Sequence, residues 1–393
     1  GAPPGEKLMS RPLAMLGVLM LLAGSAVAAG DVLPMGDLDG DGAVTADDAR
    51  LLARVLAGNA TAVPAGDAAA DLDGSGAAGA VDLSLIARKA DGGIDYRREM
   101  RWFVGAISRE ARAARPGCEV IPQNGQELLT VDGTAAGAFV PAYIDAITGI
   151  GREDTYYGYD ADNAATPADV TAYFEGFMDR AAAAGRTVMA IDYCSDPAKM
   201  DDSYATAAAR GYISFAADHR DLDNIPTYPA APFRAHGGDV AALADARNFL
   251  YLINPGAFGD DRTGFLATLA ATDFDLVLVD LFFNDGAALT PAEVAALKTK
   301  AGGGRRPVVA YLSIGEAEDY RYYWQPEWAV SPPAWLGDEN PAWPGNYKVD
   351  YWHPGWQAII RGGAGSYLRR ILDAGFDGVY LDLIDAFEYY ESR

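Results

Sequence analysis

The chain has 393 residues, of which 50% are hydrophobic, and its 55 acidic and 31 basic side chains give a formal net charge of −24. This length allows one large and one small domain, and the apolar content excludes a disordered chain. The excess of carboxylates excludes nucleic acid or an anionic membrane as partner, because both need clustered cations. It suits a cationic polymer, or else a surface adapted for solubility and salt.

Residues 1–29 have the pattern of a secretory signal. Lys7 and Arg11 precede an apolar run, 13–27, and the tripeptide Ala-Val-Ala follows at the end of that run. A charged start, an apolar middle and a small-residue cleavage site are typical of export signals. The run is short for a membrane-spanning helix. We therefore expect a secreted, extracellular protein.

Residues 34–93 contain two copies of an acidic loop, DLDGDGAVTADD from Asp37 and DLDGSGAAGAVD from Asp71. Oxygen donors recur at loop positions one, three, five, seven and twelve, with glycine at six, as a tight calcium loop requires. The predicted Ca²⁺ ligands are Asp37, Asp39, Asp41, the Ala43 carbonyl and Asp48 in the first loop, and Asp71, Asp73, Ser75, the Ala77 carbonyl and Asp82 in the second.

Each loop runs into a helix-like segment, and the duplicated unit resembles a type I dockerin. It departs from a full EF-hand because Asp, rather than Glu, closes each loop. The resemblance implies structural calcium and attachment to a cohesin-bearing scaffold protein. A calcium-stabilised spacer without a cohesin partner is the alternative.

Between residues 96 and 393, strand-like and helix-like segments alternate, which favours parallel βαβ units. So many units favour a TIM-type (β/α)8 barrel over a doubly wound sheet. The helices expected include 167–184, 291–300 and 357–374. Two cysteines, Cys118 and Cys194, sit beside predicted strands, and we expect them to be buried free thiols. The predicted strands are 119–123, 146–152, 187–193, 212–216, 249–254, 276–281, 308–313, 347–351 and 378–383.

Polar side chains follow many of these strands, for example Glu153, Asp192, Asp280 and Asp382. In a barrel, the carboxyl ends of the strands carry the functional residues, so a carboxylate-lined pocket is predicted there. Six of the seven tryptophans lie between 324 and 356. Aromatic faces pack against the apolar faces of sugar rings, and we expect half of these tryptophans to form such a platform and half to be structural.

A family resemblance is carried by VVAYLSIGEAEDYRYYW, NPAWPGNYKVDYW and GFDGVYLDLIDAFEYY, and by VIPQNGQELL, DAITGIGREDTYY and AIDYCSDPAKMDDSYATAAARGYISF. These stretches resemble the endo-α-1,4-polygalactosaminidases and their relatives in glycoside hydrolase family 114, over nearly all of 96–393. In the family's usual order, the FLYLINPG-type segment opens the barrel and QNGQELL follows VYLDLID. The chain is thus similar to a circularly permuted member, a rearrangement that barrels tolerate.

The resemblance implies an endo-acting glycosidase that cleaves a polysaccharide, such as an α-1,4-linked galactosamine polymer, without a catalytic cofactor. It implies a catalytic pair, with Asp382 as nucleophile or charge stabiliser and Glu153 as general acid/base. The predicted substrate-binding residues are Asp280, Glu316, Tyr311, Arg321, Asn124, Asp192, Asp350, Tyr380, Asp385 and Trp352.

Three other functions compete with this one. A non-catalytic carbohydrate-binding barrel, displayed through the dockerin-like module, would use the same acids for binding alone. A deacetylase or another metal-dependent hydrolase is disfavoured because His219, His236 and His353 form no HxxxH pair. A purely structural surface protein is disfavoured by the many acids at strand ends.

Overall fold

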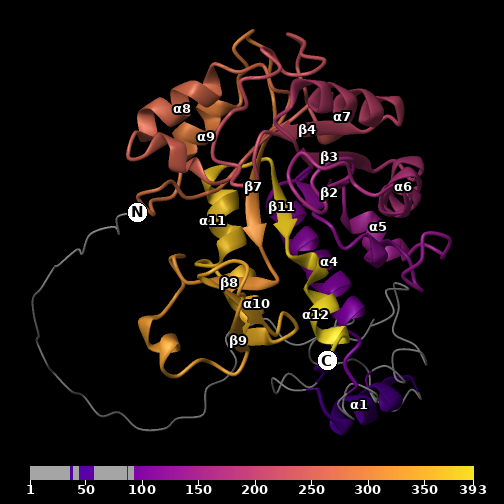
Figure 1. The fold of residues 1–393 in the computed structure, drawn as a ribbon. Coiled ribbons are helices and arrows are strands. Elements are labelled where there is room, and N and C mark those ends of the chain that lie inside the picture. The colour runs from indigo at the N-terminus through magenta and orange to yellow at the C-terminus, as the bar shows by residue number, and fades with distance from the viewer. Residues whose placement is uncertain (1–35, 39–43, 57–85, 87–92) are drawn as a thin grey trace, which may run out of the picture.

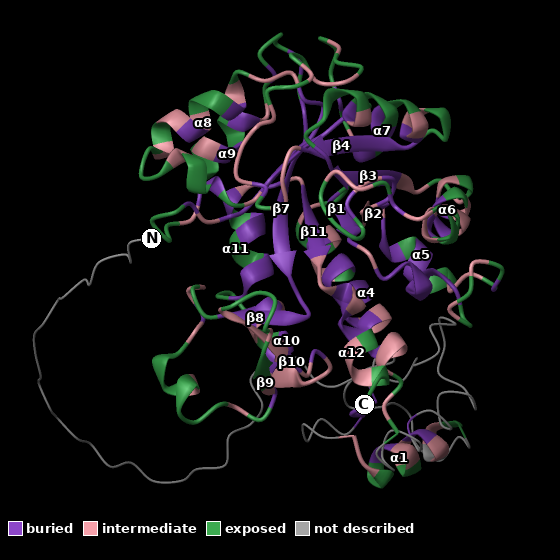
Figure 2. Ribbon diagram, in the orientation of Figure 1, coloured by how far each residue is buried: buried purple, intermediate pink, exposed green. Residues whose placement is uncertain are grey.

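The computed structural model describes residues 36–38, 44–56, 86 and 93–393. Its centre is a ring of parallel strands (Figure 1), formed by apolar runs that are buried on both faces (Figure 2). In chain order these strands are β1 (Glu119–Pro122), β2 (Gly149–Glu153), β3 (Thr187–Tyr193), β4 (Ile213–Ala217), β5 (Leu250–Leu252), β6 (Val277–Val279), β7 (Val308–Ser313) and β11 (Gly378–Asp382).

The first and last of these strands are hydrogen-bonded neighbours. Val120 of β1 pairs with Val379 of β11 in parallel register, and β11 pairs in turn with β7. A parallel bridge between Gln123 and Gly151 joins β1 to β2. These contacts join the eight strands into one continuous sheet, in which β4 and β5 are the last strands. Because β4 and β5 also contact each other, the sheet curves back on itself, unlike an open doubly wound sheet. The arrangement is compatible with a TIM-type barrel.

The ring is weakest between β4 and β5. No ladder joins these two strands in the part of the chain that the structure describes. Instead, the Ile253 and Asn254 amides, just beyond β5, donate to the Leu222 carbonyl at 3.1 and 3.2 Å. The connection, 218–249, is irregular apart from the 3-10 helix η2 (Leu243–Asp245), whereas the other connections carry α-helices. Its length and irregularity mark a seam in the barrel.

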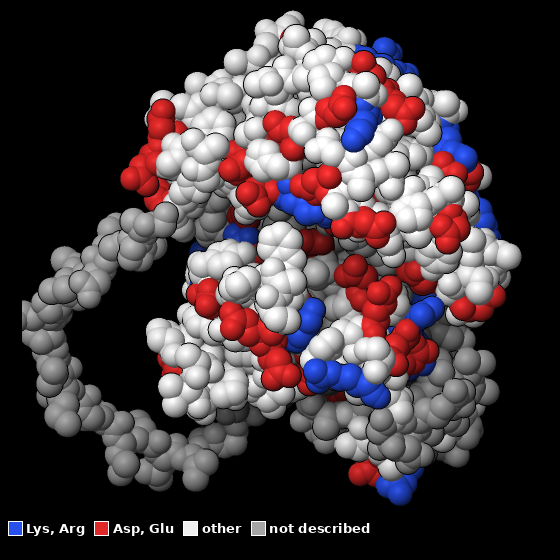
Figure 3. Space-filling view, in the orientation of Figure 1, with Lys and Arg blue, Asp and Glu red and all other residues white. Residues whose placement is uncertain are grey.

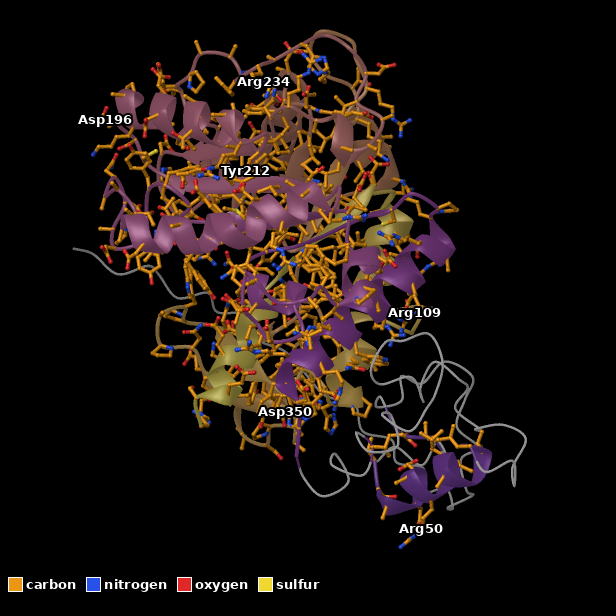
Figure 4. The ribbon with its side chains drawn as sticks, turned by 90° about the vertical axis from the view of Figure 1, so that its right-hand side faces the viewer. Arg50, Arg109, Asp196, Tyr212, Arg234 and Asp350 are labelled. Atoms are coloured by element: carbon orange, nitrogen blue, oxygen red, sulfur yellow. The ribbon has the colours of Figure 1, made fainter. Side chains whose placement is uncertain are left out.

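Helices surround the strands, and their outer sides are exposed to solvent (Figure 2). Figure 4 shows two of them, α4 and α7, on the outer side, with Arg109 on α4 and Asp196 at the start of α7. Thr290 caps α9 in a capping box with Glu293, and Pro291 follows it as the sequence suggests. The helices around the ring are α4 (Tyr96–Ala114), α5 (Pro141–Ala146), α6 (Ala168–Ala183), α7 (Pro197–Ala209), α8 (Arg262–Ala270), α9 (Pro291–Leu297), α10 (Pro354–Ile360), α11 (Tyr367–Ala374) and α12 (Phe387–Glu391).

Two predicted elements were wrong. The strand expected at 347–351 is β10 (Asn346–Val349), which pairs antiparallel with β8 (Glu316–Glu318) and β9 (Leu336–Glu339) in a small side sheet rather than in the ring. The side sheet lies beyond the tips of β7 and β11 (Figure 1). The helix expected at 357–374 is two helices, because the glycines between α10 and α11 interrupt it and Gly362 has φ 93°.

At the amino end of the ring, two carboxylates are neutralised by cations. Asp275, just before β6, is fully buried and lies 3.0 Å from the Lys300 ammonium and 3.1 Å from the His236 ring. Asp377, just before β11, lies 2.6 Å from Lys298. These ion pairs link the segments that precede β6 and β11 to the segment that follows α9, at the amino end of the barrel.

In the N-terminal module the described core is small. Leu38, Leu52 of α1 (Ala46–Leu56) and Ile86 are fully buried and pack against Trp102 of α4. Asp37 and Asp48 are buried, and the Leu38 amide donates to Asp48 at 2.6 Å. The predicted first and last ligands of the loop are thus both buried, and Asp48 also accepts from the Thr45 amide at 2.7 Å. The other predicted ligands, Asp39, Asp41, Ala43, Asp71, Asp73, Ser75, Ala77 and Asp82, and the predicted signal, 1–29, lie outside the described residues.

Cys118 and Cys194 are buried and free, as predicted, and burial raises the pKa of the Cys118 thiol to about 11. Within the described ranges, no helix has the length and apolarity needed to span a membrane. Within the same ranges, no three His, Cys, Asp or Glu side chains form a group that would bind a metal ion.

Candidate active site

A cavity of about 330 Å³ opens at the carboxyl end of the ring, where acidic side chains lie around a hollow in the centre of the face shown in Figure 3. Carboxylates outnumber cations in its wall. The carboxylates are Glu153, Asp280, Glu316, Glu318 and Asp382, and the cations are Arg220 and Arg321. The cavity therefore favours a neutral or cationic ligand over an anion.

The centre of the cavity is a pair of carboxylates held by one amide. Gln123, just after β1, donates through Nε2 to Glu153 Oε2 at 2.9 Å and to Asp382 Oδ1 at 3.1 Å. Because the two oxygens lie at these distances from the same nitrogen, they are no more than 6.0 Å apart. The ends of β2 and β11, which flank β1, thus bring together two acids that are far apart in the chain.

The orientation of Glu153 is fixed by its neighbours on β1 and β2. Asn124 Nδ2 donates to Glu153 Oε2 at 3.0 Å, and Asn124 Oδ1 accepts from the Glu153 amide at 3.2 Å. Arg152 Nη1 also donates to Asn124 Oδ1, at 3.2 Å, and its guanidinium lies over the Phe174 ring. Asn124 has φ 62°, a left-handed conformation that asparagine adopts more readily than most residues. These contacts hold the Asn124 amide with its nitrogen toward Glu153.

A layer of tyrosines supports the pair from inside the ring. Tyr193 donates to Glu153, Tyr311 to Asp382 at 2.7 Å, and Tyr251 to Gln123 Oε1 at 3.0 Å. Tyr380 completes the layer next to Gly151, where a Cβ would lie 1.9 Å from its hydroxyl oxygen. Only glycine fits at this position, because a side chain on β2 would displace Tyr380.

The two acids disfavour each other's charge. Burial, together with the nearby Glu153 carboxylate, raises the pKa of Asp382 to about 8, although the Tyr311 hydroxyl acts in the opposite direction. At neutral pH a carboxyl with this pKa holds its proton in the ligand-free protein. A protonated carboxyl beside a second carboxyl is what acid-assisted cleavage of a glycosidic bond requires.

A second charged group forms the wall of the cavity beside β6. The Arg321 guanidinium lies 2.7 Å from Asp280 and 2.7 Å from Glu318, and all three side chains are 7% exposed or less. Farther along, Lys348 pairs with Glu316, whose other oxygen, Oε2, is buried without a hydrogen-bond partner. Arg321 is thus committed to structural ion pairs, whereas Glu316 keeps an acceptor at the cavity wall.

Most of the residues predicted for the site lie together. The cavity is lined by the two expected catalytic acids and by five of the expected binding residues, Asp280, Glu316, Tyr311, Arg321 and Asn124.

Five other predicted binding residues lie outside it. Asp192 is buried and accepts from the Tyr156 and Tyr157 amides and Ser203. Asp350 faces Tyr390 near the start of α4 (Figure 4). Tyr380 lies deeper in the ring, Asp385 lies behind the pair beside Arg152 and Glu388, and Trp352 packs on Tyr96 and Tyr390.

The sequence analysis missed several residues of the site. Gln123 bridges the pair, Tyr193 and Tyr251 support it, and Arg220, Glu318, Tyr320 and Trp343 line the cavity. A recurring signal marks the tyrosine layer, since VMAIDY, FLY, VVAY and GVY each carry a tyrosine near the end of a strand.

The predicted aromatic platform is smaller than expected. Trp324, Trp328, Trp335 and Trp356 form a chain of ring contacts with centroids 5.1–5.3 Å apart, so they pack the insertion around the side sheet. Of the six clustered tryptophans, Trp343 lines the cavity, and it is 54% exposed.

A (β/α) ring with two carboxyls at its carboxyl end is typical of glycoside hydrolases. Comparison with known proteins agrees. Residues 263–393 match the model of the glycoside-hydrolase family GH114, and residues 35–89 match the type I dockerin domain. The GH114 match contains Asp382, whereas Glu153 lies outside it.

Uncharacterized relatives come from three organisms. One from Deinococcus radiodurans is 46% identical over 140 residues, and one from Methanocaldococcus jannaschii is 50% identical over 125 residues. One from Thermotoga maritima is 43% identical over 122 residues. The matches cover 35%, 31% and 31% of this chain, and the chain spans 42%, 34% and 36% of the relatives' lengths.

Proposed function

We propose that this protein is a retaining, endo-acting glycoside hydrolase in which Asp382 and Glu153 are the catalytic pair. The observation that carries the proposal is the single Gln123 amide between two carboxyl oxygens no more than 6.0 Å apart. Retaining enzymes hold their carboxyls roughly 5–5.5 Å apart, and inverting enzymes roughly 6.5–9.5 Å. The upper limit here supports the retaining spacing.

In the proposed reaction, Asp382 attacks the anomeric carbon and forms an ester as the glycosidic C–O bond breaks. Glu153 gives its proton to the departing oxygen. Water then attacks the anomeric carbon, one of its protons passes to Glu153, and the bond to Asp382 breaks to release it as a carboxylate. The shared proton must therefore lie on Glu153 when the bond breaks, and the positive charge that develops on the sugar ring favours ionised Asp382 at that moment.

The proposed substrate is a polymer of α-1,4-linked galactosamine. Five carboxylates and two cations in the cavity wall support a cationic sugar, and the resemblance of the barrel motifs supports the linkage. We also propose that the barrel is circularly permuted. In an unpermuted barrel the chain would begin and end at the irregular seam between β4 and β5. The pairing of β1 with β11 and a GH114 match that begins at residue 263 support this position.

The test is hydrolysis of amino-sugar and neutral polysaccharides by the parent, Asp382→Asn and Glu153→Gln, with reducing ends as readout. Both variants are expected to lose at least about a thousandfold in rate while circular dichroism shows them folded. A parent that binds a glycan without cleaving it would overturn the enzyme in favour of a carbohydrate-binding barrel.

An aryl glycoside whose leaving group needs no protonation separates the two roles. Glu153→Gln should still form the ester on Asp382 and accumulate it, which intact-protein mass spectrometry detects. Asp382→Asn should form none. The reverse pattern would exchange the two roles.

For residues 34–93 we propose structural Ca²⁺ binding and attachment to a cohesin, with export through residues 1–29. The dockerin match and the burial of the predicted ligands Asp37 and Asp48 support this. Calorimetry of the full chain with Ca²⁺, followed by a panel of cohesins, tests both parts. Calcium binding without cohesin binding would leave a calcium-stabilised spacer.

A further inference from the structure

A second cavity, of about 300 Å³, adjoins the one that holds the catalytic pair. The two cavities share the wall residues Ile253, Asn254, Asp280, Tyr320 and Arg321. They are therefore neighbouring compartments of one cleft, separated by side chains from the ends of β5 and β6 and from the segment after β8.

The exposed aromatic residue of the shared wall is Tyr320. Its side chain is among the large apolar groups left in solvent, with 62% of the residue exposed. Its hydroxyl donates to Glu318 Oε1 at 2.7 Å, and the Arg321 guanidinium lies 5.2 Å from its ring centroid. Because Glu318 is itself fixed by Arg321, the ring is anchored at its tip, and Arg321 lies over one of its faces while most of the residue stays exposed. An aromatic ring held in this way binds a flat apolar surface, such as a sugar face, at little entropic cost.

The second compartment differs in charge from the first. Asp280 is its one carboxylate, and Arg321 neutralises it at 2.7 Å. The rest of its lining carries no charge, and it includes the rings of Phe282 and Phe283 and the amides of Asn254 and Asn284. A sugar bound here meets rings and neutral hydrogen-bonding groups rather than the excess of carboxylates in the catalytic compartment.

We propose that the second compartment is a sugar-binding subsite for a neighbouring unit of the substrate chain, with Tyr320 as its stacking platform and no requirement for positive charge on that unit. This proposal rests on the proposed function, since it places the next unit of the same polymer. It also supplies the physical basis for cleavage within a chain, because an internal bond has units to occupy both compartments.

The test is calorimetric titration of the full-length Asp382→Asn variant, with and without Tyr320→Ala, against galactosamine and its α-1,4-linked oligosaccharides up to the hexasaccharide. Affinity should rise from the monosaccharide until both compartments are filled. Tyr320→Ala should weaken oligosaccharide binding by about tenfold more than monosaccharide binding, through loss of one ring contact. Tyr320→Phe keeps the ring and loses its anchor, so its effect should be smaller.

A matched control is Tyr173→Ala. Tyr173 is 44% exposed and its hydroxyl also bonds a carboxylate, that of Glu127, but it lies on the outer helix α6. This variant should leave the dependence on chain length unchanged. Added salt should weaken monosaccharide binding and leave the increment for oligosaccharides nearly intact, because salt screens charge and the second compartment is neutral.

The outcomes separate the two proposals. If Tyr320→Ala keeps the full length dependence while the parent cleaves polymer, the second compartment is wrong and the proposed function stands. If the length dependence disappears with Tyr320 but the parent never cleaves, the cleft is a binding groove and the catalytic proposal fails. If no oligosaccharide binds, both fail.

Discussion

The two ends of the barrel treat buried carboxylates in opposite ways. At the amino end, Asp275 meets the ammonium of Lys300 and Asp377 meets that of Lys298, so each negative charge is cancelled locally. At the carboxyl end, Glu153 and Asp382 lie together among amides and hydroxyls, and neither forms an ion pair with any residue that the structure describes. Buried carboxylates thus stabilise the fold through ion pairs at one end, whereas at the other end they repel each other. The position of the nearest cation distinguishes the two roles.

The largest expected effect lies at the amino end. Asp275→Ala leaves Lys300 as an uncompensated charge at a site with no exposure, and should lower the free energy of unfolding by about 3 kcal/mol. Urea unfolding measures this, and kcat at a temperature where the variant is folded should match the parent. Asp373→Ala, which removes an exposed pair with Arg369, is the control and should not move the midpoint. Equal losses in both variants would remove the distinction between buried and exposed pairs.

At the carboxyl end, removal of a buried carboxylate should stabilise the fold rather than destabilise it. The pKa of Asp382 is about 8 in the folded chain, above the value of about 3.9 in an unfolded one, so folding loses stability as pH rises between these values. Asp382→Asn removes this dependence. It should be more stable than the parent by on the order of 2 kcal/mol near pH 8 and by almost nothing near pH 4, in urea titrations at both pH values. A variant that is less stable at the higher pH would contradict the repulsion.

The same shared proton limits activity. Cleavage needs one proton on the pair, whichever acid holds it, and the pKa of Asp382 is about 8. Above that pH, kcat/KM should fall by about tenfold per pH unit as the last proton is lost. A pH profile with the proposed polymer as substrate measures this. A rate that stays flat to higher pH would place the proton elsewhere.

The smallest effect concerns the tyrosine layer. The Tyr311 hydroxyl lowers the pKa of Asp382, so Tyr311→Phe should move the alkaline limb of the profile to higher pH and reduce kcat by about tenfold. Tyr193→Phe removes the donor to Glu153 and is the companion variant for the other acid. A lower kcat with an unmoved limb would make Tyr311 a packing residue alone.

Apolar runs allowed the ring to be predicted closely. The segments 187–193 and 308–313 coincide with β3 and β7, because long buried parallel strands are written as continuous apolar runs. The antiparallel β10 was misplaced in the ring because KVDY, next to aromatic residues, has the same local character as a core strand. The neighbouring strands determine which sheet such a strand joins, and the local sequence does not show which strands those are.

The site was harder to predict, since it depends on which face of a strand each residue occupies. Asp192 and Tyr193 are neighbours at the end of β3, yet Asp192 binds the Tyr156 amide and Ser203, and Tyr193 reaches Glu153. Alternation along a strand puts them on opposite faces, and a shift by one residue exchanges them. The pairing of Glu153 with Asp382 depends on ring closure, so only the family resemblance singled out these two acids.

That closure also sets the order of events during folding. The Gln123 contact to Asp382 spans 259 positions, so the two halves of the catalytic pair come from strands made early and late in synthesis. Until β11 docks, β1 has an unpaired edge and the carboxylates lie in separate, solvated segments. Contacts of such long range form slowly and after local ones. The chain therefore assembles its reactive centre as its final step, and an incomplete chain carries neither the repulsion nor the chemistry.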